Sequence, residues 1–77
     1  MSELTHYFVS GRGYWGRGDT LAQAIANAKH LSPGDRAFWA RCTPTTRVDE
    51  VGHVYGHLSD ATHGKIGRRG TFKAVTP

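Results

Sequence analysis

The sequence predicts an α+β fold in which a single helix packs on one face of a small antiparallel sheet, in the order β-α-β-β-β. The chain has 77 residues, a length typical of one domain. One segment repeats apolar residues at the spacing of a helix, and several shorter segments are rich in the aromatic and β-branched residues of strands. Only 14 of the 77 residues are Leu, Ile, Val or Phe, so the core must be small. We therefore expect residues 1–77 to form a single compact domain.

The first predicted strand covers residues 5–10, Thr-His-Tyr-Phe-Val-Ser, and a glycine-rich segment follows it. Residues 11–18, Gly-Arg-Gly-Tyr-Trp-Gly-Arg-Gly, contain four glycines. So many glycines oppose a helix because each loses much backbone entropy on ordering, and we expect a loop or a hairpin with a bulge. The segment also matches Gly-x-Gly-x-x-Gly, but bulky Trp15 and the short chain argue against a dinucleotide site.

The predicted helix begins after Asp19 or Thr20, either of which can cap it. Its apolar residues share one stripe at helical spacing: Leu21, Ala24, Ile25, Ala28 and Leu31. The small alanines would let this helix lie close to a sheet. Residues 32–35, Ser-Pro-Gly-Asp, are typical of a turn and end the helix.

Three further strands are predicted after the helix, in residues 36–42, somewhere within 47–58, and in 71–75. Alternation within 36–42 places Phe38, Ala40 and Cys42 on one face. Short connections favour an antiparallel meander of these strands. Residues 59–70 are polar and glycine-rich, so we expect a loop there, or a hairpin around Ile66.

Membrane spans and disulfides are not expected. The longest run of large apolar residues, 7–9, is far too short to cross a bilayer, and the first residues lack the apolar core of a secretory signal. Cys42 is the single cysteine, so no disulfide forms within the chain. We therefore expect a cytoplasmic protein without membrane contact.

The histidines and Cys42 are weak candidates for chemistry. His53 and His57 have the spacing of two zinc ligands on a helix, but their neighbours predict a strand. Residues four apart on a strand lie about 13 Å from each other, too far to share an ion. Cys42 fits a small buried residue better than a nucleophile. We predict no metal, no cofactor and no catalytic residue, and therefore not an enzyme.

The distribution of charge is the strongest functional signal. The net charge is +4, and residues 61–77 carry four cations and no anion. These cations are Lys65, Arg68, Arg69 and Lys73. The glycine-rich segment adds two arginines around two aromatic residues: Arg12, Tyr14, Trp15 and Arg17.

Basic side chains beside aromatic ones are typical of surfaces that neutralise phosphates and stack bases. We therefore predict that these eight residues bind nucleic acid or a complex that handles nucleic acid. The alternatives are that the cations are simply solvated and that Tyr14 or Trp15 completes the core. A small core gains stability from a partner, and a second copy of the chain is one such partner.

In size and architecture the chain resembles small phage and mobile-element proteins of the anti-CRISPR type. The resemblance consists of a β-α-β-β-β plan in under 80 residues, no catalytic motif and an open sheet face. It implies an alternative function, a protein-binding inhibitor that engages an acidic or nucleic-acid-binding surface of a host protein. No residue role is transferred by it.

Overall fold

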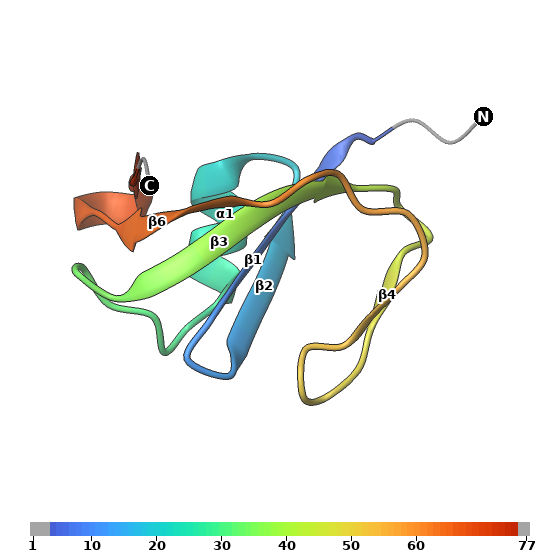
Figure 1. Cartoon of the computed structure of the whole chain (residues 1–77), viewed down its shortest axis with the longest axis horizontal. Coiled ribbons are helices and arrows are strands. Elements are labelled where there is room, and N and C mark those ends of the chain that lie inside the picture. Colours follow the sequence, from blue (N-terminus) through green and yellow to red (C-terminus); the bar gives the residue numbers. More distant parts are fainter. Residues whose placement is uncertain (1–3, 76–77) are drawn as a thin grey trace.

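The computed structural model describes residues 4–75 and contains a five-stranded antiparallel sheet, one helix and a separate β-hairpin (Figure 1). The elements are β1 (His6–Gly11), β2 (Tyr14–Gly18), α1 (Leu21–Asn27), β3 (Arg36–Cys42), β4 (Arg47–Val48), β5 (Val54–Tyr55), β6 (Thr62–Ile66), the 3-10 turn η1 (Arg68–Gly70) and β7 (Phe72–Ala74). The order in the sheet is β2-β1-β3-β6-β7, and β4 pairs with β5 outside it. Within the described residues, no helix is long and apolar enough to cross a membrane.

The predicted class, one helix with a small antiparallel sheet, is confirmed, but the order β-α-β-β-β is wrong. Of the two alternatives for residues 11–18, the structure shows the hairpin, and its register runs without a bulge from Tyr7 opposite Gly18 to Gly11 opposite Tyr14. Its two-residue turn has positive φ at both positions, 50° at Arg12 and 80° at Gly13. This is the conformation that matches the twist of paired strands. Two strands therefore precede the helix, where the prediction has one.

The second half of the chain also differs from the predicted meander. Residues 47–58 contribute the β4–β5 hairpin instead of a strand of the main sheet. For residues 59–70, expected to be a polar loop or a hairpin around Ile66, the structure has β6, which ends at Ile66 and pairs with β7. β6 pairs with β3 on one side and with β7 on the other. A Cβ at Gly64 would overlap the backbone of β7 at Lys73, so this glycine permits close pairing rather than a loop.

The helix begins where the sequence predicts and ends earlier. The Thr20 hydroxyl accepts a hydrogen bond from the Gln23 backbone N–H at 3.1 Å, and the Gln23 side chain accepts one from the Asp19 N–H at 3.0 Å. This reciprocal pair satisfies two donors at the helix start. α1 ends at Asn27, although Ala28 beyond it is still buried.

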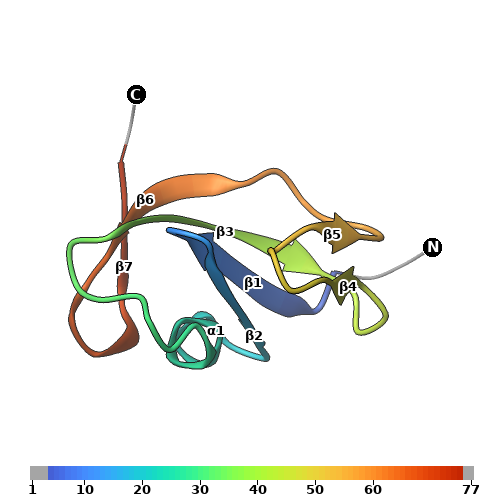
Figure 2. The same cartoon turned by 90° about the horizontal axis from the view of Figure 1, so that it is seen from below.

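The core lies between α1 and the sheet. Val9 of β1, Ala37 of β3 and Ile66 of β6 form one buried cluster with Ala24 and Ile25 of the helix. Figure 2 shows α1 below the sheet and the β4–β5 hairpin at the right, beside the end of β3. The alternation of each strand therefore divides the sheet into a side that faces the helix and a side that faces away from it.

The side facing away from the helix is buried only in part. Phe8, Ala40 and Cys42 lie on this side and are at most 1% exposed. The turn of the β4–β5 hairpin also reaches this side of the sheet. A Cβ at Gly52 would be 3.7 Å from the ring of Trp15, which lies against Phe8. Towards the start of β3 and the end of β6 the same side is exposed, which leaves part of the sheet surface open.

Candidate functional site

A row of three cations crosses the open part of the sheet. The strand register places Arg36 of β3 opposite Lys65 of β6, and Lys65 opposite Lys73 of β7. All three are exposed, and they stand on the side away from the helix because their neighbours Ala37 and Ile66 belong to the helix-facing core. Adjacent strands are about 4.8 Å apart, so the three backbone positions span about 10 Å. We call Arg36, Lys65 and Lys73 the cation row.

No carboxylate among residues 4–75 forms an ion pair with the cation row. The ion pairs in this part of the chain are those of Arg12 with Asp35, His6 with Asp19, and His53 with Asp49. Like charges directly opposite each other on neighbouring strands destabilise a sheet. The row therefore lowers the stability of the fold, and an anion placed over it would relieve the repulsion.

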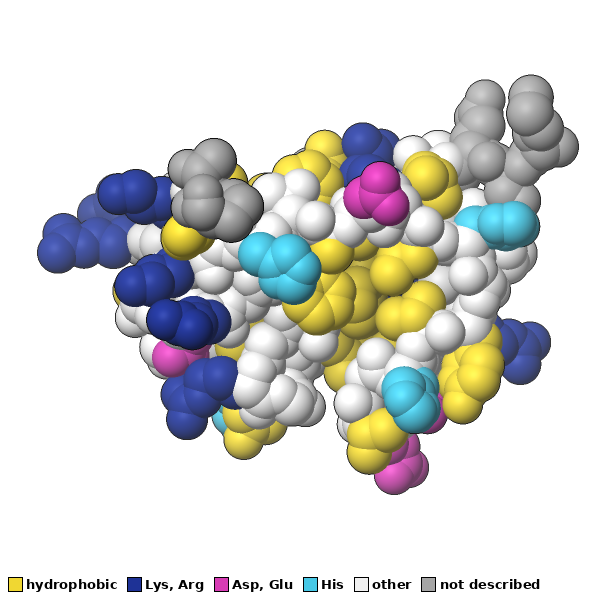
Figure 3. Space-filling view, in the orientation of Figure 1, with side chains coloured by type: hydrophobic (Ala, Val, Ile, Leu, Met, Phe, Trp, Pro, Cys, Tyr) yellow, Lys and Arg dark blue, Asp and Glu magenta, His cyan; other side chains and the backbone are white. Residues whose placement is uncertain are grey.

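Arg68 and Arg69 extend the basic surface beyond the ends of β6 and β7. Both are exposed in η1, and Arg69 has a left-handed backbone with φ 55° and ψ 42°. Figure 3 shows the Lys and Arg side chains gathered at the left end of the molecule, over the ends of β3 and β6 and the turn between β6 and β7. Four of the eight predicted site residues thus lie at one end of the sheet.

An open groove lies next to the cation row. Its lining includes the row itself together with Ser10, Phe38, His63 and Val75. Phe38 is opposite His63 in the register, and their ring centroids are 5.6 Å apart with an interplanar angle of 47°. The groove therefore joins an aromatic surface to a positively charged one.

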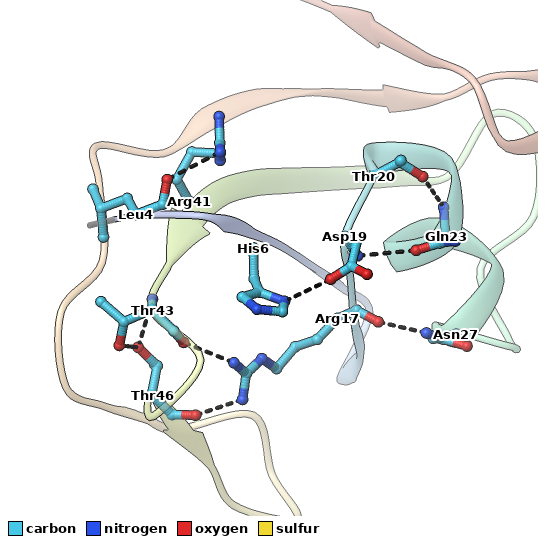
Figure 4. A network of polar contacts seen from close by, with 10 residues as sticks. All are labelled: Leu4, His6, Arg17, Asp19, Thr20, Gln23, Asn27, Arg41, Thr43 and Thr46. Atoms are coloured by element: carbon cyan, nitrogen blue, oxygen red, sulfur yellow. Dashed lines mark hydrogen bonds and ion pairs between the residues drawn. The ribbon is translucent and has the colours of Figure 1, made fainter. Parts of the chain in front are cut away.

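The other predicted arginines already have partners within the protein. The guanidinium of Arg17 donates hydrogen bonds to the carbonyl oxygens of Thr43, at 2.8 Å, and of Thr46 (Figure 4). Arg12 forms an exposed ion pair with Asp35 at 3.2 Å. Both arginines are therefore engaged by groups of the protein itself, unlike the cation row. Arg17 also lies away from the row, on β2.

The predicted aromatic residues are also apart from the groove. Trp15 is half-buried and lies against Phe8, with ring centroids 6.2 Å apart, on the side of the sheet away from the helix and outside the core cluster. Tyr14 is 42% exposed, and its ring lies 4.6 Å from that of His30. Neither side chain lines the groove.

Arg36, Phe38 and His63 were missed by the sequence analysis. Alternation within residues 36–42 does place Arg36 on the face of Phe38, so part of the signal was present. His63 and Lys65 share a face in the same way, but the sequence leaves their segment between a loop and a hairpin around Ile66. The register that brings these residues together depends on pairing between β3 and β6, which are distant in sequence.

Other candidates for chemistry remain isolated. Among residues 4–75, no three His, Cys, Asp or Glu side chains are grouped so that they could hold a metal ion. Asp49 accepts hydrogen bonds from the backbone N–H groups of His53, at 2.9 Å, and Val51, at 3.0 Å. The bond from His53 is the main cause that lowers the pKa of the Asp49 carboxyl below its usual value. These contacts close the turn of the β4–β5 hairpin.

Comparison with protein-family models, with curated proteins and with solved structures finds no match to the chain. Its function therefore has to be inferred from its own residues.

Proposed function

We propose that the protein is a non-catalytic nucleic-acid-binding module whose basic surface neutralises phosphates. Arg36, Lys65 and Lys73 would contact the phosphate chain from the open face of the sheet, and Arg68 and Arg69 would extend the contact at its end. The observation that carries the proposal is the cation row, three cations directly opposite one another without a carboxylate partner in residues 4–75.

A phosphate chain is suited to this surface because it is itself a row of charges of the opposite sign. Each Lys or Arg side chain that neutralises a phosphate releases the counterion condensed on that phosphate, which favours binding at low salt. The same anion also removes the repulsion between the opposed cations. A single small anion would satisfy one or two of the five basic side chains, whereas a chain of phosphates can satisfy all of them.

The proposal is tested by the salt dependence of binding. Fluorescence anisotropy with labelled single-stranded and double-stranded DNA and RNA is measured between about 50 and 200 mM salt. If all five cations contact phosphates of a single strand, the logarithm of the binding constant should fall with the logarithm of salt with a slope of about −3.5. Lys65→Gln should weaken binding to every sequence and reduce the magnitude of that slope by about 0.7.

The matched control is Lys29→Gln, which removes the same charge from an exposed position outside the basic surface. It should leave both the affinity and the salt slope unchanged to first order. Absence of binding to all four nucleic acids at about 50 mM salt, where electrostatic contacts are strongest, would refute the proposal.

A second candidate function is favoured by the β4–β5 hairpin. Val51 at its turn is 74% exposed and Tyr55 is 60% exposed. Exposed apolar side chains that cluster on one element are typical of protein contacts. This agrees with the protein-binding inhibitor that the anti-CRISPR resemblance implies. A host protein that binds the wild type and Lys65→Gln equally, but not a Val51→Ser/Tyr55→Ser variant, would support this second function.

A further inference from the structure

Two aromatic side chains lie beside the cation row, on the same side of the sheet. Phe38 is two residues from Arg36 on β3, and His63 is two residues from Lys65 on β6. Residues two apart on a strand point to the same side and are about 6.6 Å from each other. Because Phe38 and His63 are also opposite in the register, they form an aromatic pair parallel to the cation row.

The aromatic pair is accessible, and one of its rings is packed against the protein. His63 is exposed, Phe38 is half-buried, and both line the groove. Phe38 is flanked on the same side of the sheet by the buried ring of Phe8, whose centroid is 6.0 Å away. A ring held in this way loses little conformational entropy when a flat ligand stacks on it.

We propose that this site selects single-stranded nucleic acid, by stacking unpaired bases on Phe38 and His63 while the cation row holds the adjacent phosphates. The proposal rests on the function proposed above and adds the substrate class. The separation of the two rows is comparable to the distance between a phosphate and its own base. Bases in a duplex are paired and stacked inside the helix, so a duplex could use the cations but not the aromatic pair. Stacking on an aromatic ring also tolerates any base, since every base has a flat face.

Three probes of equal length separate the two contributions. They are an oligothymidylate of about 12 nucleotides, an abasic strand with the same number of phosphates, and a blunt duplex of that length. Binding is measured by fluorescence anisotropy at one low salt concentration. One stacked base should make the oligothymidylate bind about 5- to 150-fold tighter than the abasic strand. Because a duplex carries twice the phosphates, its affinity is compared per phosphate.

Two variants test the aromatic pair itself. Phe38→Leu and His63→Thr should lower the affinity for oligothymidylate towards that of the abasic strand and leave the abasic affinity unchanged. Phe38→Tyr, which retains a flat ring, should keep the wild-type preference. Lys65→Gln serves as the opposite control and should weaken binding to both strands by a similar factor. His63 is exposed, so His63→Thr decides the question if Phe38→Leu proves unfolded by circular dichroism.

The outcomes separate the two proposals. Equal affinity per phosphate for all three probes, with no effect of His63→Thr, would overturn the single-strand inference and leave nucleic-acid binding standing. Absence of binding to every probe would overturn the proposed function and this inference with it. Tighter binding to the oligothymidylate that is lost in His63→Thr would support both.

Discussion

Arg17 shows that the same residue type serves two purposes in this chain. Its guanidinium joins β2 to the segment after β3 through the carbonyl oxygens of Thr43 and Thr46, both in buried residues. The local sequence around Arg17 resembles that around Arg12, since each lies between glycines. The difference arises from a loop more than 25 residues away in the chain, which a local pattern does not reveal.

We expect Arg17→Lys to lower the free energy of unfolding by about 1–3 kcal/mol, because an ammonium lacks the fork that reaches both carbonyl oxygens. Urea denaturation measures the change. The affinity of the folded variant for nucleic acid should stay at the wild-type value. Arg12→Lys is the control and should change stability by less than about 1 kcal/mol, since an exposed ion pair contributes little. Equal stability of the two variants would show that the Arg17 contacts are not structural.

At the scale of elements, the glycines of β2 set the distance between strand and helix. A Cβ at Gly16 would overlap the backbone of Ala24 and Ala28, and one at Gly18 would overlap that of Ala24. The absence of side chains at these positions lets α1 lie directly on β2. The alanines of the helix stripe indicate close packing with a sheet, whereas the glycines facing them indicate a loop or a hairpin with a bulge. A glycine-rich segment has the same composition whether it forms a loop or a strand packed closely against a helix, so only the packed structure distinguishes the loop from the strand.

We expect Gly16→Ala to lower the free energy of unfolding by about 1–3 kcal/mol, because the added methyl group forces the helix away from the strand. Thermal and urea denaturation measure the loss. Gly13→Asn is the control in the same hairpin: unlike at Gly16, φ is positive there, but nothing lies within 4 Å of the added Cβ and Asn tolerates this turn conformation. The control should stay close to wild type, and a similar loss in both variants would contradict the close-packing explanation.

Across the whole molecule, charge is distributed unevenly. Cations gather at one end of the open face, and Asp49 and Glu50 lie in the β4–β5 hairpin at the other end (Figures 1 and 3). The concentration of charge in residues 61–77 is visible in the sequence, and the structure places Lys65 opposite Lys73 within that segment. Arg36 lies beside Lys65 because β3 pairs with β6. The register of that pairing is determined by tertiary packing, which a single sequence does not specify.

We expect Lys65→Gln to raise the free energy of unfolding at low salt by about 0.2–1 kcal/mol, since it removes the central charge from two repulsive cross-strand pairs. Thermal denaturation at about 10 mM salt measures the gain in stability. The gain should shrink at about 1 M salt, because salt then screens the repulsion between the cations in the wild type as well. Lys29→Gln, away from the row, should show no such gain. A loss of stability in Lys65→Gln at low salt would mean that other groups of the protein already offset the repulsion within the cation row.

The position of Cys42 gives the molecule an internal reporter. It is the single thiol of the chain, it is completely buried, and it lies on the same side of the sheet as Phe8 and Ala40. An alkylating reagent can reach it only when the sheet opens, so the rate of modification follows the population of opened molecules. Any ligand that binds only the closed sheet must slow this reaction, about 100-fold at a free concentration 100 times its Kd. Occupancy of the open face can therefore be followed from the other end of β3, by the reactivity of one sulfur atom in the unaltered protein.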